Sequence, residues 1–261
     1  RGFDVTPLVK EELWHKSCTY SSMSALLNYR FGYRLDQAGI EVRLLLDWFE
    51  NQVIDRGMVA GFHEFHPSTK TVGYRGFFIS EDYHIYVNPT AYEWQSGVVP
   101  RELVVTGSGL KASVREFCDQ LNVVIGPSFR YQHLWEEADG SRHAGGERYT
   151  VLVALPIFLD SARDIIEKVV TTIGTISDPL RVRFKPHPTY GKETVTPYLP
   201  ADSAHDIEVV MGEFAPHLGQ ADLLISRSSS ACVEAVAQGT PVIVLGSADG
   251  FTQNPIPETA D

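Results

Sequence analysis

Four serines stand within five positions near the C-terminal end of this 261-residue chain. Ser226, Ser228, Ser229 and Ser230 fall in the turn of a strand–turn–helix–strand pattern over residues 221–246. A helix that begins in such a turn offers unpaired backbone N–H groups, hydroxyl donors and its positive dipole end to an anion. One serine would serve as an ordinary helix cap, but four hydroxyls exceed that requirement. The turn therefore predicts a phosphate-binding site.

A basic residue and a His-Pro pair end another expected strand, residues 181–185. Pro186 and Pro188 fix the backbone on either side of His187, so its imidazole is held in a defined direction. A neutral histidine donates one hydrogen bond and a protonated one adds charge, which suits a phosphate that is bound and later released. We therefore expect Lys185, His187 and Pro188 to contact the same phosphate as the serines.

The net charge of −11 argues against broad binding to nucleic acid or to anionic membranes, so we expect no nucleic-acid partner. It leaves room for a local basic pocket, and Arg181, Arg183 and Arg227 lie close to the two turns in sequence. Glu234 stands one turn into the helix that follows the serines. It either packs locally or accepts hydrogen bonds from the ribose hydroxyls of a nucleotide bound at the turn.

Two carboxylates of the N-terminal half, Asp47 and Glu50, follow an apolar stretch, residues 40–46, that is typical of a buried strand. Carboxylates at the carboxyl end of such a strand point into the ligand cleft of an α/β sheet, where partial burial can raise a pKa. We expect Glu50 to act as general base or nucleophile, with Asp47 as the second candidate. The alternative is that Asp47 or Asn51 caps the helix that follows.

The candidates for acceptor binding are four polar residues near the later strands of this half. They are His63, His66, Arg75 and Ser108. Ser108 lies in a glycine turn, residues 106–109, which lacks the full spacing of a dinucleotide fingerprint. His63 and His66 are three residues apart but have no third metal ligand nearby in sequence. We therefore expect neither a metal nor a bound cofactor.

Composition places the chain among globular proteins, with 43% hydrophobic and 21% charged residues. Its longest apolar runs are too short to cross a bilayer. Its three cysteines have no paired spacing, which suits a reducing cytoplasm. The chain starts without Met or a signal sequence, so we expect a fragment with a truncated N-terminal domain.

Strand and helix patterns alternate along both halves, which predicts parallel sheets covered by helices on both faces. We expect an N-terminal Rossmann-like domain (residues 1–125), a polar linker (126–148) and a C-terminal Rossmann-like domain (149–261), with a functional cleft between the two domains. Expected strands are residues 40–46, 71–78, 103–105, 150–156, 181–185, 207–211, 222–226 and 241–245. Expected helices are residues 21–29, 52–65, 110–121, 161–176 (capped by Asp160 or Ser161), 213–219 and 230–238.

This arrangement resembles the GT-B glycosyltransferases that use CMP-activated acidic sugars, namely bacterial sialyltransferases, polysialyltransferases and Kdo transferases. In those families a His-Pro motif and a Ser/Thr-rich motif of the C-terminal domain contact CMP, and the counterparts here are His187-Pro188 and Ser228-Ser229-Ser230. An acidic motif of their N-terminal domain supplies catalysis. The sialyltransferase triplet of two acidic residues and a glycine is absent here, so the choice of Glu50 follows from its position. Residues 48–52, 73–77 and 126–135 are also similar to surface carbohydrate biosynthesis proteins.

The resemblance implies a metal-independent transferase that moves Kdo or a sialic-type sugar from CMP to a surface polysaccharide. Its partners would be the nucleotide-sugar donor and an oligosaccharide or lipid-linked acceptor. The protein would lie in the cytoplasm and associate peripherally with the inner face of the membrane. Two alternatives remain: a UDP-sugar transferase or UDP-N-acetylglucosamine 2-epimerase-like enzyme of the same architecture, and a non-catalytic glycan- or partner-binding module.

Overall fold

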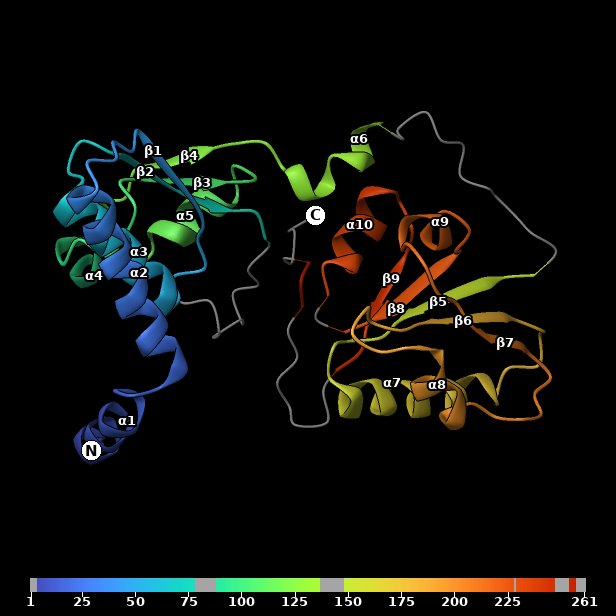
Figure 1. Cartoon of the computed structure of the whole chain (residues 1–261). Coiled ribbons are helices and arrows are strands. Elements are labelled where there is room, and N and C mark those ends of the chain that lie inside the picture. Colours follow the sequence, from blue (N-terminus) through green and yellow to red (C-terminus); the bar gives the residue numbers. More distant parts are fainter. Residues whose placement is uncertain (1–3, 78–87, 137–147, 228, 247–253, 257–261) are drawn as a thin grey trace. The chain divides into compact units, whose positions relative to one another are not determined.

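The computed structural model describes residues 4–77, 88–136, 148–227, 229–246 and 254–256 (Figure 1). The chain divides into two compact units. The first comprises the described residues up to Phe129, and the second those from Arg130 onward. This division falls inside the stretch 126–148 that was expected to be a linker.

The first unit holds a parallel sheet in the order β1-β2-β3-β4. Its strands are β1 (Leu44–Trp48), β2 (Lys70–Arg75), β3 (Glu102–Val105) and β4 (Val123–Ile125). Its helices are α1 (Thr6–Lys16), α2 (Tyr20–Gln37), α3 (Val53–Phe65), α4 (Ala91–Gln95) and α5 (Leu110–Arg115). Consecutive strands are neighbours, so the carboxyl ends of β1, β2 and β3 meet at one edge of the sheet.

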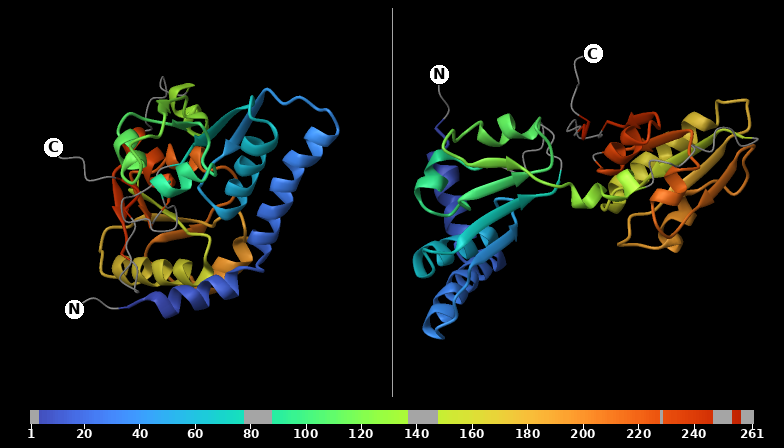
Figure 2. Two further views of the ribbon diagram at one scale, coloured as in Figure 1. Left: turned by 90° about the vertical axis from the view of Figure 1, so that its left-hand side faces the viewer. Right: turned by 90° about the horizontal axis from the view of Figure 1, so that it is seen from above.

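Helix α3 is fixed at its start and along its length. The Gln52 side chain accepts from the N3 backbone while Asp55 accepts from the Gln52 N–H, which forms a reciprocal cap. Glycines then allow α3 to cross α2 at backbone contact (Figure 2). A Cβ at Gly57 would lie 2.1 Å from the Ala25 carbonyl oxygen, and one at Gly61 would lie 2.6 Å from the Tyr29 oxygen. These contacts set the position of the loop between β1 and α3.

The second unit holds a five-stranded parallel sheet in the order β7-β6-β5-β8-β9. This is the strand order of the Rossmann fold. Its strands are β5 (Thr150–Ala154), β6 (Arg181–Lys185), β7 (Asp206–Val209), β8 (Leu223–Ser226) and β9 (Val242–Val244). Its helices are α6 (His133–Glu136), α7 (Leu159–Ile173), α8 (Lys192–Val195), α9 (Ala215–Leu218) and α10 (Ala231–Ala237), with 3-10 turns η1 (Phe129–Tyr131), at the boundary between the units, and η2 (Thr196–Tyr198).

Helices cover both faces of this second sheet. Helices α7 and α8 pack on one face, and α9 and α10 pack on the other (Figure 1). Strand β5 is buried at all five positions, as a central strand with two covered faces must be. Along α7 the residues Ile165, Ile166 and Val169 point into the core, and this burial stabilises the sheet by about 1.5–3 kcal/mol per side chain.

Several boundaries differ from those expected. The first strand begins at Leu44 and extends to Trp48, so Asp47 lies in β1 and not beyond it. Helix α3 is capped by Gln52, which corrects the alternative that Asp47 or Asn51 caps it. Helix α7 begins after Phe158 without a side-chain cap, so the expected caps at residues 160 and 161 were wrong. Helices α1, α4, α6 and α8 and strand β4 were not predicted.

Candidate functional site

In the parallel sheet of the second unit, the order of the strands reverses at β5. Strands β6 and β7 lie on one side of β5, whereas β8 and β9 lie on the other. In open α/β sheets, ligands bind outside the carboxyl ends of the strands at such a switch point. The expected phosphate ligands follow the carboxyl ends of β6 and β8, the two strands that flank β5.

Lys185 ends β6 and is a buried residue, 7% exposed. Its Nζ lies 3.5 Å from the Pro186 carbonyl oxygen. Burial alone lowers the pKa of Lys185, and no acidic group contributes to the shift. A buried ammonium without a carboxylate partner is costly to the fold. This position therefore favours an anion supplied by a ligand.

The loop after β6 orients the imidazole of His187. Its Nδ1 accepts a hydrogen bond from the Thr189 N–H at 3.3 Å and lies 3.0 Å from Thr189 Oγ1. A backbone N–H can only donate, so the neutral ring carries its proton on Nε2. Burial, and secondarily the charge of Lys185, lowers the pKa of His187. The ring is therefore a neutral Nε2–H donor near neutral pH. Pro188, beside it, is exposed.

The serine turn contributes fewer groups than the sequence indicated. Ser226 is buried, and its Oγ donates to the Ala154 carbonyl at 3.1 Å, which joins β8 to β5. Ser229 Oγ accepts from the Ala231 N–H at 3.2 Å. Ser230 directly precedes α10, and its side chain does not cap the helix. Ser228 lies outside the described residues. Ser229 and Ser230 thus remain as the hydroxyls beside the start of α10.

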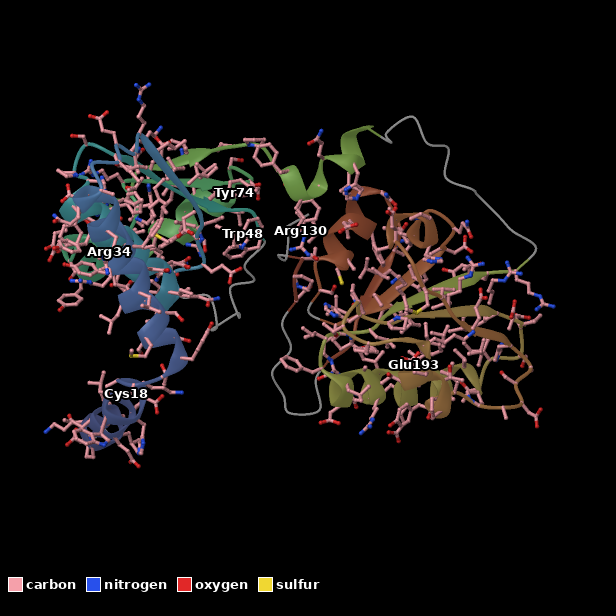
Figure 3. All side chains as sticks on the ribbon, in the orientation of Figure 1. Cys18, Arg34, Trp48, Tyr74, Arg130 and Glu193 are labelled. Carbon is pink, nitrogen blue, oxygen red and sulfur yellow. The ribbon has the colours of Figure 1, made fainter. Side chains whose placement is uncertain are left out.

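Two residues of the expected linker join this group, and sequence reasoning missed both. Arg130 Nη2 donates to Ser230 Oγ at 2.8 Å (Arg130 is labelled in Figure 3). His133 Nε2 lies 3.4 Å from Glu234 Oε2. Burial raises the pKa of Glu234, while His133 and Arg130 oppose that rise. In the sequence, these contacts are indicated only by a basic residue and a histidine three positions apart. This spacing is too weak a signal to predict that Arg130 and His133 contact the region of α10.

The expected basic pocket is smaller than the sequence suggested. Arg181 and Arg183 pair with Asp206 and Glu208 on the neighbouring strand β7, at 3.0 and 2.7 Å. Arg227 pairs with Asp164 of α7 and also donates to the Gly246 carbonyl. These three guanidinium groups are therefore paired within the second unit. Of the cations expected in this pocket, Lys185 is left for a phosphate, and Arg130 joins it within the described part of the second unit.

The two carboxylates of the first unit lie at the carboxyl end of β1 in different surroundings. Glu50 accepts from Trp48 Nε1 at 2.8 Å and from Gln52 Nε2 at 2.6 Å. Asp47 Oδ2 is buried and has no hydrogen-bond partner among the described residues. Burial, and secondarily the charge of Asp55, raises the pKa of Asp47 to about 6. Asp47 can therefore exchange a proton near neutral pH, whereas Glu50 is held as an oriented acceptor.

The four expected acceptor-side residues are placed differently from one another. His63 contacts the Gly97 carbonyl oxygen at 2.8 Å and Thr71 Oγ1 at 2.9 Å, so both ring nitrogens connect parts of the first unit. His66 Nε2 lies 2.9 Å from the Gly32 oxygen and connects α3 to α2. Ser108 is exposed in the turn before α5. Arg75 ends β2 and is 1% exposed.

Among the described residues, no cluster of three or more His, Cys, Asp or Glu side chains is arranged to hold a metal ion. Within the same residues, no helix is both long and apolar enough to span a membrane.

Comparison with solved structures identifies the fold. The chain is similar to MurG of Acinetobacter baumannii, with 14% identity and a TM-score of 0.50 over 87% of this chain and 59% of that one. It is also similar to a chain of the GtfA/B complex, with 14% identity and a TM-score of 0.51 over 86% of this chain and 47% of that one. The chain thus spans less than two thirds of the length of either. No family model matches the sequence, and no curated protein matches it significantly.

These similarities define the class of fold. Both units are Rossmann-like, and the chain has the two-domain fold of the GT-B glycosyltransferases. This confirms the expected fold class. At 14% identity this similarity shows the fold alone.

Proposed function

We propose that the protein is a glycosyltransferase that moves a sugar from a nucleotide-activated donor to a glycan acceptor. The observation that carries this proposal is the buried, acid-free ammonium of Lys185 at the carboxyl end of β6. It stands where an α/β sheet binds its ligand, and it needs an anion. The phosphate of a nucleotide sugar supplies one.

The second unit would bind the donor. Lys185 and Arg130 neutralise phosphate charge, and His187 donates from Nε2. Ser229 and Ser230 add hydroxyls beside the start of α10. These preorganised groups would stabilise the charge that develops on the leaving phosphate, with no metal and no cofactor beyond the donor itself. Glu234 would accept from the ribose hydroxyls after exchanging its contact with His133.

For the nucleotide we propose CMP, carrying Kdo or a sialic-type acid, because His187-Pro188 and the serines resemble the CMP-binding motifs. A UDP-sugar user of the same architecture is the alternative. The two are separated by titrating CMP and UDP against the same protein, since the ligand that binds the folded state more tightly raises the melting temperature more.

The first unit would supply the carboxylate that assists attack by the acceptor hydroxyl. Asp47 has the pKa suited to a general base, and Glu50 has the fixed orientation. Replacing each by its amide distinguishes them. The true base loses transfer by about 100-fold or more when replaced and leaves nucleotide binding unchanged.

For the acceptor we propose an oligosaccharide or lipid-linked glycan of a surface polysaccharide, met at the inner face of the membrane. Exposed apolar side chains on α1 and α2 support peripheral association, because such patches mark contact surfaces. Leu13 is 66% exposed, Trp14 81% and Leu27 68%.

The test is a melting series with CMP and UDP on the wild type and on Lys185→Met, His187→Ala and the Ser229/Ser230 double alanine variant. Lys192→Met, on the exposed face of α8, is the control. We expect the three site variants to lose nucleotide stabilisation and the control to keep it. Equal stabilisation in all four proteins would refute the donor site. No stabilisation of the wild type by either nucleotide would favour the non-catalytic binding module.

A further inference from the structure

Arg75 is a buried cation for which the described chain provides no hydrogen-bond partner. Its Nε and both Nη atoms are buried and make no hydrogen bond to any described residue. Desolvation lowers its pKa to about 10, so the guanidinium remains charged at neutral pH. Glu50 is the one charge that counters this effect, and the oxygens of Glu50 already accept from Trp48 and Gln52. A buried guanidinium with five unsatisfied N–H donors favours the binding of an anion from outside the chain.

Other unsatisfied atoms gather at the same sheet edge. Thr106 Oγ1, just past the end of β3, is buried and unbonded within the described residues. Asp47 Oδ2, near the end of β1, is in the same state. Strands β1, β2 and β3 are consecutive neighbours. Each therefore brings one polar group that lacks a hydrogen-bond partner in the described part of the chain to the edge where α/β sheets bind ligands.

An aromatic surface borders Arg75. Its guanidinium carbon lies 5.6 Å from the centroid of the Phe77 ring, and the Phe77 ring lies 6.0 Å from that of Trp48. Trp48 packs edge-on against Tyr74 at 5.6 Å (Figure 3) and is still 46% exposed. Gly76 permits this pair, because a Cβ there would lie 2.4 Å from Tyr74 Cε1 and 2.7 Å from Trp48 Cζ3. An exposed, fixed indole offers an apolar surface to the C–H face of a sugar ring.

We propose that Arg75 binds the anionic group of an acidic acceptor sugar whose ring rests on Trp48. This inference rests on the proposed function and specifies its acceptor: a sugar bearing a carboxylate or a phosphate. The planar guanidinium binds either group through two parallel hydrogen bonds, and Thr106 supplies a hydroxyl to the ring substituents. Acceptors without the anion leave Arg75 unpaired, so the site discriminates against neutral glycans.

The test uses three probes: glucuronate for the carboxylate, glucose 1-phosphate for the phosphate, and methyl glucoside as the neutral control. Binding is followed by NMR through the indole N–H resonance of Trp48, which is identified by its loss in Trp48→Phe. We expect glucuronate or glucose 1-phosphate to bind about 10- to 150-fold more tightly than methyl glucoside. The tighter of the two identifies the anion.

Two variants connect this preference to Arg75. Arg75→Met should reduce the affinity for the preferred probe to that for methyl glucoside, and Arg75→Lys should lose most of it because lysine lacks the planar fork. Both should keep stabilisation by CMP or UDP. The preference should also survive in Lys185→Met, which separates this site from the donor site.

Three results would overturn the proposal. One is equal binding of the charged and neutral probes by the wild type, which needs no variant to fold. Another is an unchanged preference in Arg75→Lys or Arg75→Met. The third is loss of the preference in Lys185→Met, which would place the anion at the donor site.

Discussion

Asp47 offers a quantitative test of the first unit, because its carboxylate is ionised at a cost to the folded state. Burial and the charge of Asp55 raise its pKa from 3.8 to about 6. Each pKa unit corresponds to about 1.4 kcal/mol. The ionised side chain therefore destabilises the fold by up to about 3 kcal/mol, and its partial exposure places the expected value at about 1–3 kcal/mol.

The pH dependence has a definite sign. Between pH 3.8 and about 6 the folded protein holds a proton that the unfolded chain has released, so stability falls as the pH rises through this window. Above the window the whole cost is present, and below it the cost disappears. Asp47→Asn removes the charge. The variant should therefore be more stable than the wild type at pH 7.5, and the difference should nearly vanish at pH 4.

Urea unfolding followed by tryptophan fluorescence from pH 4 to pH 8 measures this difference. Trp14, Trp48 and Trp94 all lie in the unit that contains Asp47. At about 1–3 kcal/mol per molar urea, we expect the midpoint at pH 7.5 to rise by roughly 0.5–2 M. Asp36→Asn, an exposed change on α2, is the control and should shift little. A gain of the same size at pH 4 and at pH 7.5, or a loss at neutral pH, would refute the reasoning.

Four further substitutions test individual residues. Lys185→Met should raise the melting temperature, because it removes an unpaired buried charge, and weaken nucleotide binding by about 10- to 150-fold in calorimetry; unchanged binding would contradict it. Glu50→Gln should reduce transfer without changing nucleotide affinity, and full turnover would leave Asp47 as the base. Gly61→Ala should cost about 1–3 kcal/mol in urea unfolding, because its Cβ would meet α2 backbone, and a neutral effect would contradict this close crossing. Trp14→Gln should reduce co-sedimentation with phosphatidylglycerol–phosphatidylethanolamine vesicles, and equal sedimentation would remove the membrane contact.

Periodicity and turn residues determined most of the second unit. The strand at 181–185 was predicted at its observed bounds, and Gly239 ends α10 with a φ of +73°. Alternating strands and helices imposed a parallel sheet, because a crossover connection returns the chain in the same direction. The Rossmann-like class was therefore predictable from local pattern. Short elements such as β4 and α6 were not, because three or four residues carry too little periodic signal.

The candidate sites depend only partly on local sequence. The sequence placed Lys185 and His187 at a strand end because basic and proline residues follow an apolar run, and this information is local. Whether a charge is free or paired depends on which strand becomes the neighbour. Arg183 is neutralised by Glu208 only because β6 pairs with β7, whereas no carboxylate of the described residues pairs with Lys185.

The amino-acid sequence by itself determined the α/β class, the order of the main strands and helices, and the residue types that can bind an anion. The tertiary structure alone decided which of those residues are available. It joined Arg130 to Ser230 across 100 residues and buried Arg75 at the end of β2 without a hydrogen-bond partner among the described residues. The physical reason is that desolvation and charge pairing arise from neighbours that are distant in the chain. These two effects determine whether a polar group stabilises the fold or is available to bind a ligand.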